Sequence, residues 1–148
     1  VISYPSKEEE KEILRSHIMP SQQGISPVIS PKDILHAREV VKEVYIDGKI
    51  ENYIADIVFA TRFPQDYNLN DLKPFIAYGA SPRATINLAL ASRALAFIKR
   101  RGYVIPEDVR EVCMDVLRHR VGLTYEAEAE NIKAEDLVTE IVNKIEVP

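Results

Sequence analysis

Arg83 is the residue whose type and position point most directly to chemistry. It follows Ser81 and Pro82, a pair typical of the N-cap and first position of a helix. A fixed cation in the first turn opposes the helix dipole and costs about 0.3–1 kcal/mol when exposed. The same position favours an anion, because free backbone amides, the dipole and the guanidinium would all attract it. Arg83 is therefore a candidate phosphate sensor.

A second interpretation of Arg83 requires no ligand. The guanidinium could form an ion pair with a carboxylate of the preceding connector, which runs through Asp66 and Asp71. The dipole effect is small and is screened by salt, so spacing alone leaves both interpretations open.

Other catalytic motifs are absent from the sequence. A phosphate-binding loop would read G-x-x-x-x-G-K-S/T, but Gly48-Lys49 is followed by Ile50. No apolar strand ends in paired acids that could hold magnesium, and no serine lies in a nucleophile-elbow pattern. We expect the chain by itself to be non-catalytic.

Metal and disulfide chemistry is not expected either. His17, His36 and His119 are scattered, without Cys or carboxylate partners at ligand spacing, so we expect no metal site. Cys113 is the single cysteine and cannot form an internal disulfide. Its position on an apolar helical face is typical of a core thiol in a reducing compartment.

The composition is that of a globular protein, with 148 residues, 46% of them apolar and 28% charged. A net charge of −4 argues against general affinity for nucleic acid. Basic runs at 99–101 and 118–120 could form local patches, although solvated helix C-termini are the simpler interpretation. No apolar run approaches the roughly 20 residues of a transmembrane helix, and no signal peptide is recognisable. Because the sequence begins with Val1, we expect it to be cut from a longer polypeptide.

Capping residues and Pro/Gly punctuation predict about six helices. The first begins at a capping box of Ser6 and Glu9 and ends at Met19-Pro20. The others begin at Ser30-Pro31, Asp47-Gly48, Ser81-Pro82, Pro106 and Ala134, with a loop over 21–29 and a connector over 65–80. The helix after Ser81 is the longest, and we expect Gly102 to stop it just after Arg101. Being apolar on most sides, it should lie in the middle of the bundle.

Apolar residues at helical spacing support these assignments. The second and third helices carry the stripes Ile34, Ala37, Val41, Val44, Tyr45 and Ile50, Tyr53, Ile54, Ile57, Val58. In the last two helices, the residues expected to face inward are Val109, Val112, Cys113, Val116, Leu117 and Leu137, Val138, Ile141, Val142, Ile145. With no βαβ rhythm, the predicted fold class is mostly α, a helical bundle with little or no strand and a short extended piece at 103–105.

The segment Gly79-Ala80-Ser81-Pro82-Arg83-Ala84 resembles the sensor 2 motif of AAA+ ATPases in its MoxR-family form. Further matches to that family extend along nearly the whole chain. They are Tyr4-Pro5-Ser6 with the helix after it, Tyr53-Ile54 through Ala60-Thr61-Arg62, Gly102 through Val109, Val116 through Arg120, and the terminal Val147-Pro148. One departure is Ile105, which stands where the family often has Thr and cannot cap the next helix with its side chain.

The resemblance implies a lid domain at 21–148, preceded at 1–20 by the end of an AAA+ core and a hinge helix. Arg83 would reach the γ-phosphate of ATP, with Pro82 beside it, and Tyr4 and Pro5 would lie near the adenine. The P-loop and the magnesium site would belong to the missing core. Alternatively, Tyr4 simply stacks on the first helix.

The implied parent is a cytoplasmic, hexameric, chaperone-like ATPase that remodels a client or a partner with a von Willebrand factor A domain. The 118–120 run could then face a neighbouring subunit. Two alternatives stay open: a free-standing helical module that binds a partner helix or DNA without nucleotide, and the lid of a magnesium-chelatase-type ATPase.

Overall fold

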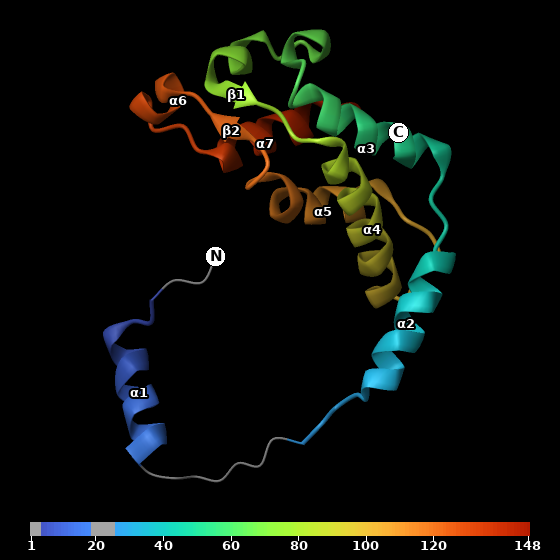
Figure 1. Cartoon of the computed structure of the whole chain (residues 1–148), viewed down its shortest axis with the longest axis vertical. Helices are drawn as coiled ribbons and strands as arrows, with labels where there is room; N and C mark the ends of the chain where they lie inside the picture. The colour runs from blue at the N-terminus through green and yellow to red at the C-terminus, as the bar shows by residue number, and fades with distance from the viewer. Residues whose placement is uncertain (1–3, 19–25) are drawn as a thin grey trace. The chain divides into compact units, whose positions relative to one another are not determined.

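The computed structural model describes residues 4–18 and 26–148 and divides into two compact units, Val1–Ile34 and Leu35–Pro148 (Figure 1). In the first unit, α1 (Lys7–Ile18) begins at the predicted capping box. The Ser6 amide donates to the Glu9 carboxylate at 2.6 Å, and the Glu9 amide donates to the Ser6 hydroxyl at 3.3 Å. The predicted end of this helix, Met19-Pro20, lies outside the described residues.

The core of the second unit is formed by α3 (Gly48–Ala60), α4 (Pro82–Ile98), α5 (Pro106–Leu117) and α7 (Ala134–Lys144) (Figure 1). α4 packs mainly on α5 and α3, and α7 packs on α5. The predicted stripe of α3 and the predicted inward face of α7 are buried throughout, while in α5 Val112 and Val116 are half-buried beside the buried Val109, Cys113 and Leu117. The helices and their contacts confirm the predicted mostly α bundle. Burial of each large aliphatic side chain contributes roughly 1.5–3 kcal/mol to its stability.

α2 (Pro31–Glu43) spans the boundary between the two units and buries none of its residues. The Ser30 amide donates to the Asp33 carboxylate at 2.8 Å, which confirms the predicted start. The predicted stripe overruns the helix, because α2 ends before Val44 and Tyr45. Val44 is buried, and Tyr45 forms a parallel bridge with Tyr103. Of the short extended piece expected at 103–105, only Tyr103 takes part in this bridge.

α4 ends earlier than predicted and for a different reason. Arg100 takes the left-handed conformation, with φ of 58°. The Arg100 amide donates to the Phe97 carbonyl and the Arg101 amide to the Ala96 carbonyl, both at 2.9 Å. This pair of bonds is a Schellman motif, in which a left-handed residue ends the helix. Gly102 does not have a positive φ, so the prediction that Gly102 stops the helix was wrong.

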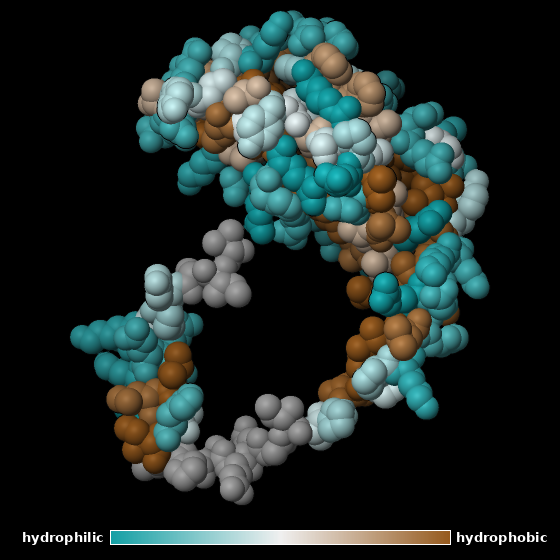
Figure 2. All heavy atoms as spheres, viewed as in Figure 1, coloured by the Kyte–Doolittle hydropathy of each residue, from teal (hydrophilic) through white to brown (hydrophobic). Residues whose placement is uncertain are grey.

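The expected central position of α4 was also wrong. Only one face of the helix is buried, through Ala84, Leu88, Ser92 and Ala96. Other apolar residues of α4 are 53–72% exposed, namely Ile86, Leu90 and Ile98. Apolar side chains accordingly interrupt the hydrophilic surface along α4 (Figure 2). The apolar residues of α4 therefore lie on both its buried face and its exposed face.

The region predicted as a plain connector contains short elements. The 3-10 helices η1 (Pro64–Tyr67) and η2 (Asn70–Phe75) precede the strand β1 (Ile76–Tyr78), which pairs antiparallel with β2 (Gly122–Leu123). The helix α6 (Tyr125–Ala129) follows β2 and was not predicted. These elements are too short for hydrophobic periodicity to reveal them. Among residues 4–18 and 26–148, no helix combines the length and apolarity that crossing a membrane would take.

Candidate functional site

The segment Gly79–Arg83 leads from β1 into α4. Ser81 is the N-cap residue, with extended backbone angles of φ −76° and ψ 167°, and Pro82 is the first helical residue. The Ala84 amide donates to the Ser81 carbonyl at 2.8 Å. The Ser81 side chain makes no capping hydrogen bond, contrary to the usual behaviour of a serine at this position. The first turn of α4 therefore receives no side-chain cap.

Thr61 and Arg62, directly after α3, hold this segment at Ala80. The Ala80 amide donates to the Thr61 hydroxyl at 2.9 Å, and Arg62 Nε donates to the Ala80 carbonyl at 2.5 Å. The Thr61 hydroxyl also donates to the Val58 carbonyl at 2.6 Å, so its lone pair is turned toward the Ala80 amide. Both backbone polar groups of Ala80 are thus fixed by the end of α3.

Gly79 allows this close approach. A Cβ at residue 79 would lie 2.4 Å from the Thr61 carbonyl oxygen and 2.7 Å from Arg62 Cγ. The Gly79 backbone does not have a positive φ, so the requirement concerns space rather than conformation. The glycine of the Gly79–Ala84 motif is needed because α3 and the segment that enters α4 are in contact here.

Arg83 is exposed in the first turn of α4. Within the described part of the chain it forms no hydrogen bond or ion pair, and neither Asp66 nor Asp71 binds it. The interpretation that needs no ligand, an ion pair to the connector, therefore finds no support. A free guanidinium lies beside an uncapped helix N-terminus, where both groups can bind an anion.

The other predicted site residues occupy exposed positions. Pro82 precedes Arg83 directly, so these two residues are brought together by the start of α4. Tyr4 and Pro5 are exposed residues of the first unit, just before α1, while Pro82 and Arg83 belong to the second unit. The exposed ring of Tyr4 does not stack on α1 as the alternative interpretation required, since Tyr4 is 97% exposed.

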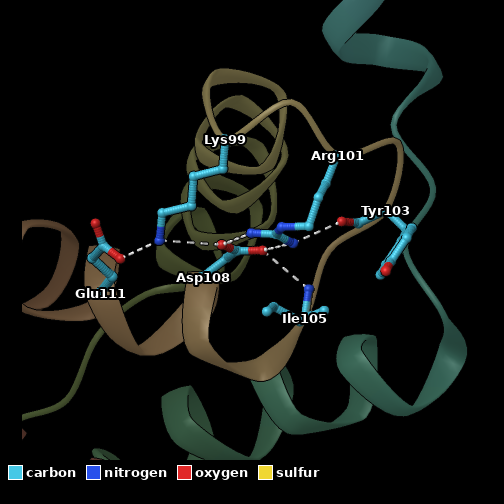
Figure 3. Close-up of polar contacts among 6 residues, drawn as sticks. All are labelled: Lys99, Arg101, Tyr103, Ile105, Asp108 and Glu111. Atoms are coloured by element: carbon cyan, nitrogen blue, oxygen red, sulfur yellow. Dashed lines mark hydrogen bonds and ion pairs between the residues drawn. The ribbon is translucent and has the colours of Figure 1, made fainter.

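The basic run 99–101 is largely used within the molecule. Arg101 donates to both carboxylate oxygens of Asp108, and Lys99 pairs with Glu111 and lies 3.6 Å from Asp108 (Figure 3). These pairs join the end of α4 to the start of α5, so the run is neither a free basic patch nor a simply solvated helix end. Only Arg100 of this run, within the described residues, has no carboxylate partner.

Asp108 also explains how α5 starts without a capping side chain. Ile105 is the N-cap residue and offers no side-chain acceptor, as its sequence implied, but its amide donates to the Asp108 carboxylate at 3.1 Å. Burial alone raises the pKa of Asp108, but the hydrogen bonds from Arg101 and Ile105 and the charges of Arg101 and Lys99 outweigh it. The pKa is therefore lowered below its ordinary value.

In the second basic run, Arg118 forms an ion pair with a residue of α5. Arg118 contacts Asp115 at 3.1 Å, and His119 is exposed. The Nε atom of Arg120 is buried and has no hydrogen-bond partner among the described residues. The idea that this run faces a neighbouring subunit stays a prediction.

Sequence reasoning missed the roles of Thr61, Arg62 and Gly79. The resemblance included the Ala60-Thr61-Arg62 and Gly79-Ala80 segments, but as separate motifs. The available signal was a Thr-Arg pair directly after an amphipathic helix, where a hydroxyl and a guanidinium can bind backbone groups of a second segment. Contact between residues about 18 positions apart could not be inferred from that pattern.

Comparison with known proteins finds relatives that match nearly the whole chain. A family model described as the AAA lid domain matches residues 70–141, which include Gly79 and Arg83. Chaperone MoxR1 of Mycobacterium tuberculosis is 40% identical over 148 residues, which cover 99% of this chain and 39% of that protein. The uncharacterized protein YeaC of Bacillus subtilis is 35% identical over 151 residues, covering 99% of this chain and 43% of that protein.

A crystal structure of another protein is similar to this chain in fold and sequence. The protein comes from Cytophaga hutchinsonii, is provisionally described as an ATPase, and has a TM-score of 0.89 and 40% sequence identity. The match covers 99% of this chain and 45% of that one. The chain thus spans about two fifths of the length of the curated relatives that match it along its whole length. The lid-domain match and these relatives show that the chain contains an AAA lid domain and that, along nearly its whole length, it is similar to MoxR-family AAA+ ATPases.

Proposed function

We propose that this chain is the nucleotide-sensing lid of an ATPase and that Arg83 binds the γ-phosphate of ATP. The observation that carries the proposal is the exposed, unpaired guanidinium of Arg83 beside the uncapped N-terminus of α4. A cation in this position is unfavourable in the empty helix and becomes favourable when a phosphate binds. Pro82 forms the adjoining wall of the same site.

The chemistry proposed for Arg83 is electrostatic. During phosphoryl transfer, negative charge is spread over the γ-phosphate oxygens, and a fixed guanidinium stabilises that charge. Loss of the phosphate after hydrolysis would release Arg83, and α4 would carry this change to the rest of the lid. The bundle would then move as a body relative to the nucleotide.

The remaining parts of the site would come from an α/β core outside this chain. The core would supply the phosphate-binding loop and the groups that hold magnesium, neither of which occurs in the sequence. In this arrangement residues 1–20 are the end of the core and a hinge helix, and 21–148 form the lid. Tyr4 and Pro5 would lie near the adenine, for which the exposed Tyr4 ring is available.

The parent protein would assemble into a hexameric ring in the cytoplasm and remodel a client protein. The Mycobacterium tuberculosis relative is named a chaperone, which supports an action on other proteins. The run 118–120 is proposed to face the neighbouring subunit, and a partner with a von Willebrand factor A domain is one candidate for the client.

The direct test is ATP turnover by the longer protein that contains this chain. Arg83→Ala should lower kcat by about 100-fold, because one electrostatic contact to the transferring group is lost. Arg83→Lys keeps the charge without the planar donor geometry, so its kcat should lie between that of the unchanged protein and that of Arg83→Ala. Arg38→Ala removes an exposed arginine of α2 and serves as the matched control. Unchanged turnover in Arg83→Ala would remove the role assigned to this residue.

Calorimetry of the chain by itself tests the division of labour between lid and core. One arginine and one tyrosine are a minority of a nucleotide site, so ATP should bind with a dissociation constant of roughly millimolar order. Micromolar affinity of the isolated chain for ATP would contradict the proposed arrangement.

A further inference from the structure

We propose that Thr61 and Arg62, at the C-terminal end of α3, are positioning residues that set the direction of the Arg83 guanidinium. This inference rests on the proposed role of Arg83. It concerns a contact that is distinct from the phosphate contact itself, because neither Thr61 nor Arg62 is required to touch the nucleotide.

The first support is the way Ala80 is held. Its amide and its carbonyl are bound by two consecutive side chains, the Thr61 hydroxyl at 2.9 Å and Arg62 Nε at 2.5 Å. Thr61 and Ala80 are both fully buried, so water does not compete for the bond between the Ala80 amide and the Thr61 hydroxyl, while the bond from Arg62 is partly buried. Two hydrogen bonds on one residue fix both its position and the orientation of its backbone.

The second support is the short path from Ala80 to Arg83. Ser81 is extended, and Pro82 has a fixed φ as the first residue of α4, so little freedom remains between the held residue and the guanidinium. Gly79, the one glycine of the motif, precedes Ala80 and so does not lie between Ala80 and Arg83. Its own backbone packs closely against the Thr61 carbonyl. A displacement of Ala80 would therefore be passed on to Arg83.

The third support is that the positioning side chains are themselves held. The Thr61 hydroxyl donates to the Val58 carbonyl at 2.6 Å within the end of α3. The Arg62 guanidinium lies over the Phe59 ring, 5.2 Å from its centroid, and the Phe59 and Phe63 rings are 6.1 Å apart. α3 in turn buries its apolar stripe in the core. Through this series of contacts, the position of Arg83 is tied to the body of the lid.

The experiment measures kcat and KM for ATP in the longer protein that contains this chain. The variants are Arg62→Gln, Thr61→Val and Thr61→Ser. Arg110→Gln is the matched control for Arg62, because Arg110 also donates to a backbone carbonyl of another element, that of Val142 at 3.1 Å. Thr139→Val is the control for Thr61, because among the described residues the Thr139 hydroxyl binds the Glu135 carbonyl of its own helix and no other element.

Positioning predicts that Arg62→Gln and Thr61→Val lower kcat by about ten-fold or more, with a much smaller change in KM, since a misdirected group loses transition-state contacts. Thr61→Ser keeps the hydroxyl and should restore kcat. The two controls should stay within about two-fold of the parent protein even where their unfolding temperatures fall. Arg62 is partly exposed, so Arg62→Gln decides the question should Thr61→Val fail to fold.

A double variant separates positioning from a merely structural effect. With Arg83→Ala already present, adding Arg62→Gln should cause no further loss of kcat, because nothing remains to be positioned. The same loss in both backgrounds, or normal kcat in Arg62→Gln when Arg83→Ala is impaired, would overturn the positioning role and leave the proposed function intact. Normal kcat in Arg83→Ala would overturn the proposed function, and the positioning role with it.

Discussion

Arg101 holds the buried carboxylate of Asp108 through two hydrogen bonds, from Nη1 to Oδ2 at 2.7 Å and from Nη2 to Oδ1 at 2.5 Å. Asp108 is completely buried, while the Arg101 side chain is 21% exposed. This pair connects the residues after α4 to the first turn of α5, and the Ile105 amide binds the same carboxylate. The α4–α5 connection is thus fixed by one carboxylate with several donors (Figure 3).

Removing the partner of this carboxylate should be costly. We expect Arg101→Ala to lower the free energy of unfolding by about 3 kcal/mol, because a buried charge loses its main counter-charge. Lys99→Ala should cost less than about 1 kcal/mol, because Lys99 is a more exposed partner. Denaturant unfolding of both variants checks the contrast, and equal losses would mean that the Arg101 pair has no special role.

The same pair predicts a pH dependence. The pKa of Asp108 is lowered in the folded protein, so its contribution to stability is complete above the unfolded pKa of about 4 and is lost as the pH falls through the folded value. Unfolding midpoints measured between pH 6 and about pH 2 should therefore fall less steeply in Asp108→Asn than in the parent. Parallel curves for the two proteins would show that this group does not contribute.

The end of α4 offers a test with paired glycine substitutions. Arg100 has a φ of 58°, which costs a non-glycine residue about 1 kcal/mol, so Arg100→Gly should stabilise the protein by up to that amount. Gly102 has ordinary φ and open space around its missing Cβ, so Gly102→Ala should be neutral or slightly stabilising. Thermal unfolding distinguishes this assignment from one in which Gly102 ends the helix, since Gly102→Ala would then be the harmful change.

Gly79 should not tolerate even a methyl group. A Cβ there would lie 2.4 Å from a backbone oxygen, so Gly79→Ala should destabilise the protein by about 1–3 kcal/mol and displace the start of α4. Gly48→Ala is the control, because nothing lies within 4 Å of its would-be Cβ. Should Gly79→Ala be as stable as Gly48→Ala, the contact with Thr61 is not as close as described.

Arg83 should lower the free energy of unfolding of the protein, although we propose that it binds phosphate. Arg83→Gln removes a cation from the positive end of α4 and should raise the free energy of unfolding by about 0.3–1 kcal/mol at low salt. The gain should shrink as salt is added, because exposed charges are screened. Lower stability of Arg83→Gln would mean that the guanidinium has a favourable partner in the folded chain.

Sequence patterns predicted most of the larger elements because their signals are local. The Ser6–Glu9 capping box, the Asp47 cap of α3 and the apolar stripes of α3 and α7 depend only on residues within a few positions of each other. The position of Arg83 in the first turn of α4 was predicted for the same reason. Whether its guanidinium is free or paired with Asp66 or Asp71 could not be predicted, because that depends on where distant carboxylates lie in the fold.

The errors concern contacts between distant residues. Gly102 was expected to end α4 because glycine usually takes the left-handed position, whereas Arg100 occupies it here. The central position expected of α4 failed because apolar content does not reveal how many neighbours a helix has. Thr61 and Ala80 are 19 positions apart, so no local pattern could show that α3 holds the segment before Arg83.

The bridge between Tyr45 and Tyr103 has a mechanical consequence. α2 buries no residue of its own, and Val44 is the first buried residue of the described part of the chain. Beside it, the Tyr45 amide donates to the Gly102 carbonyl at 2.9 Å, and the Tyr45 carbonyl accepts from the Val104 amide at 3.0 Å. Tension applied along α2 would therefore reach the bundle beside the α4–α5 turn. Single-molecule pulling on this end should detach residues 31–43 at low force before the remaining helices yield.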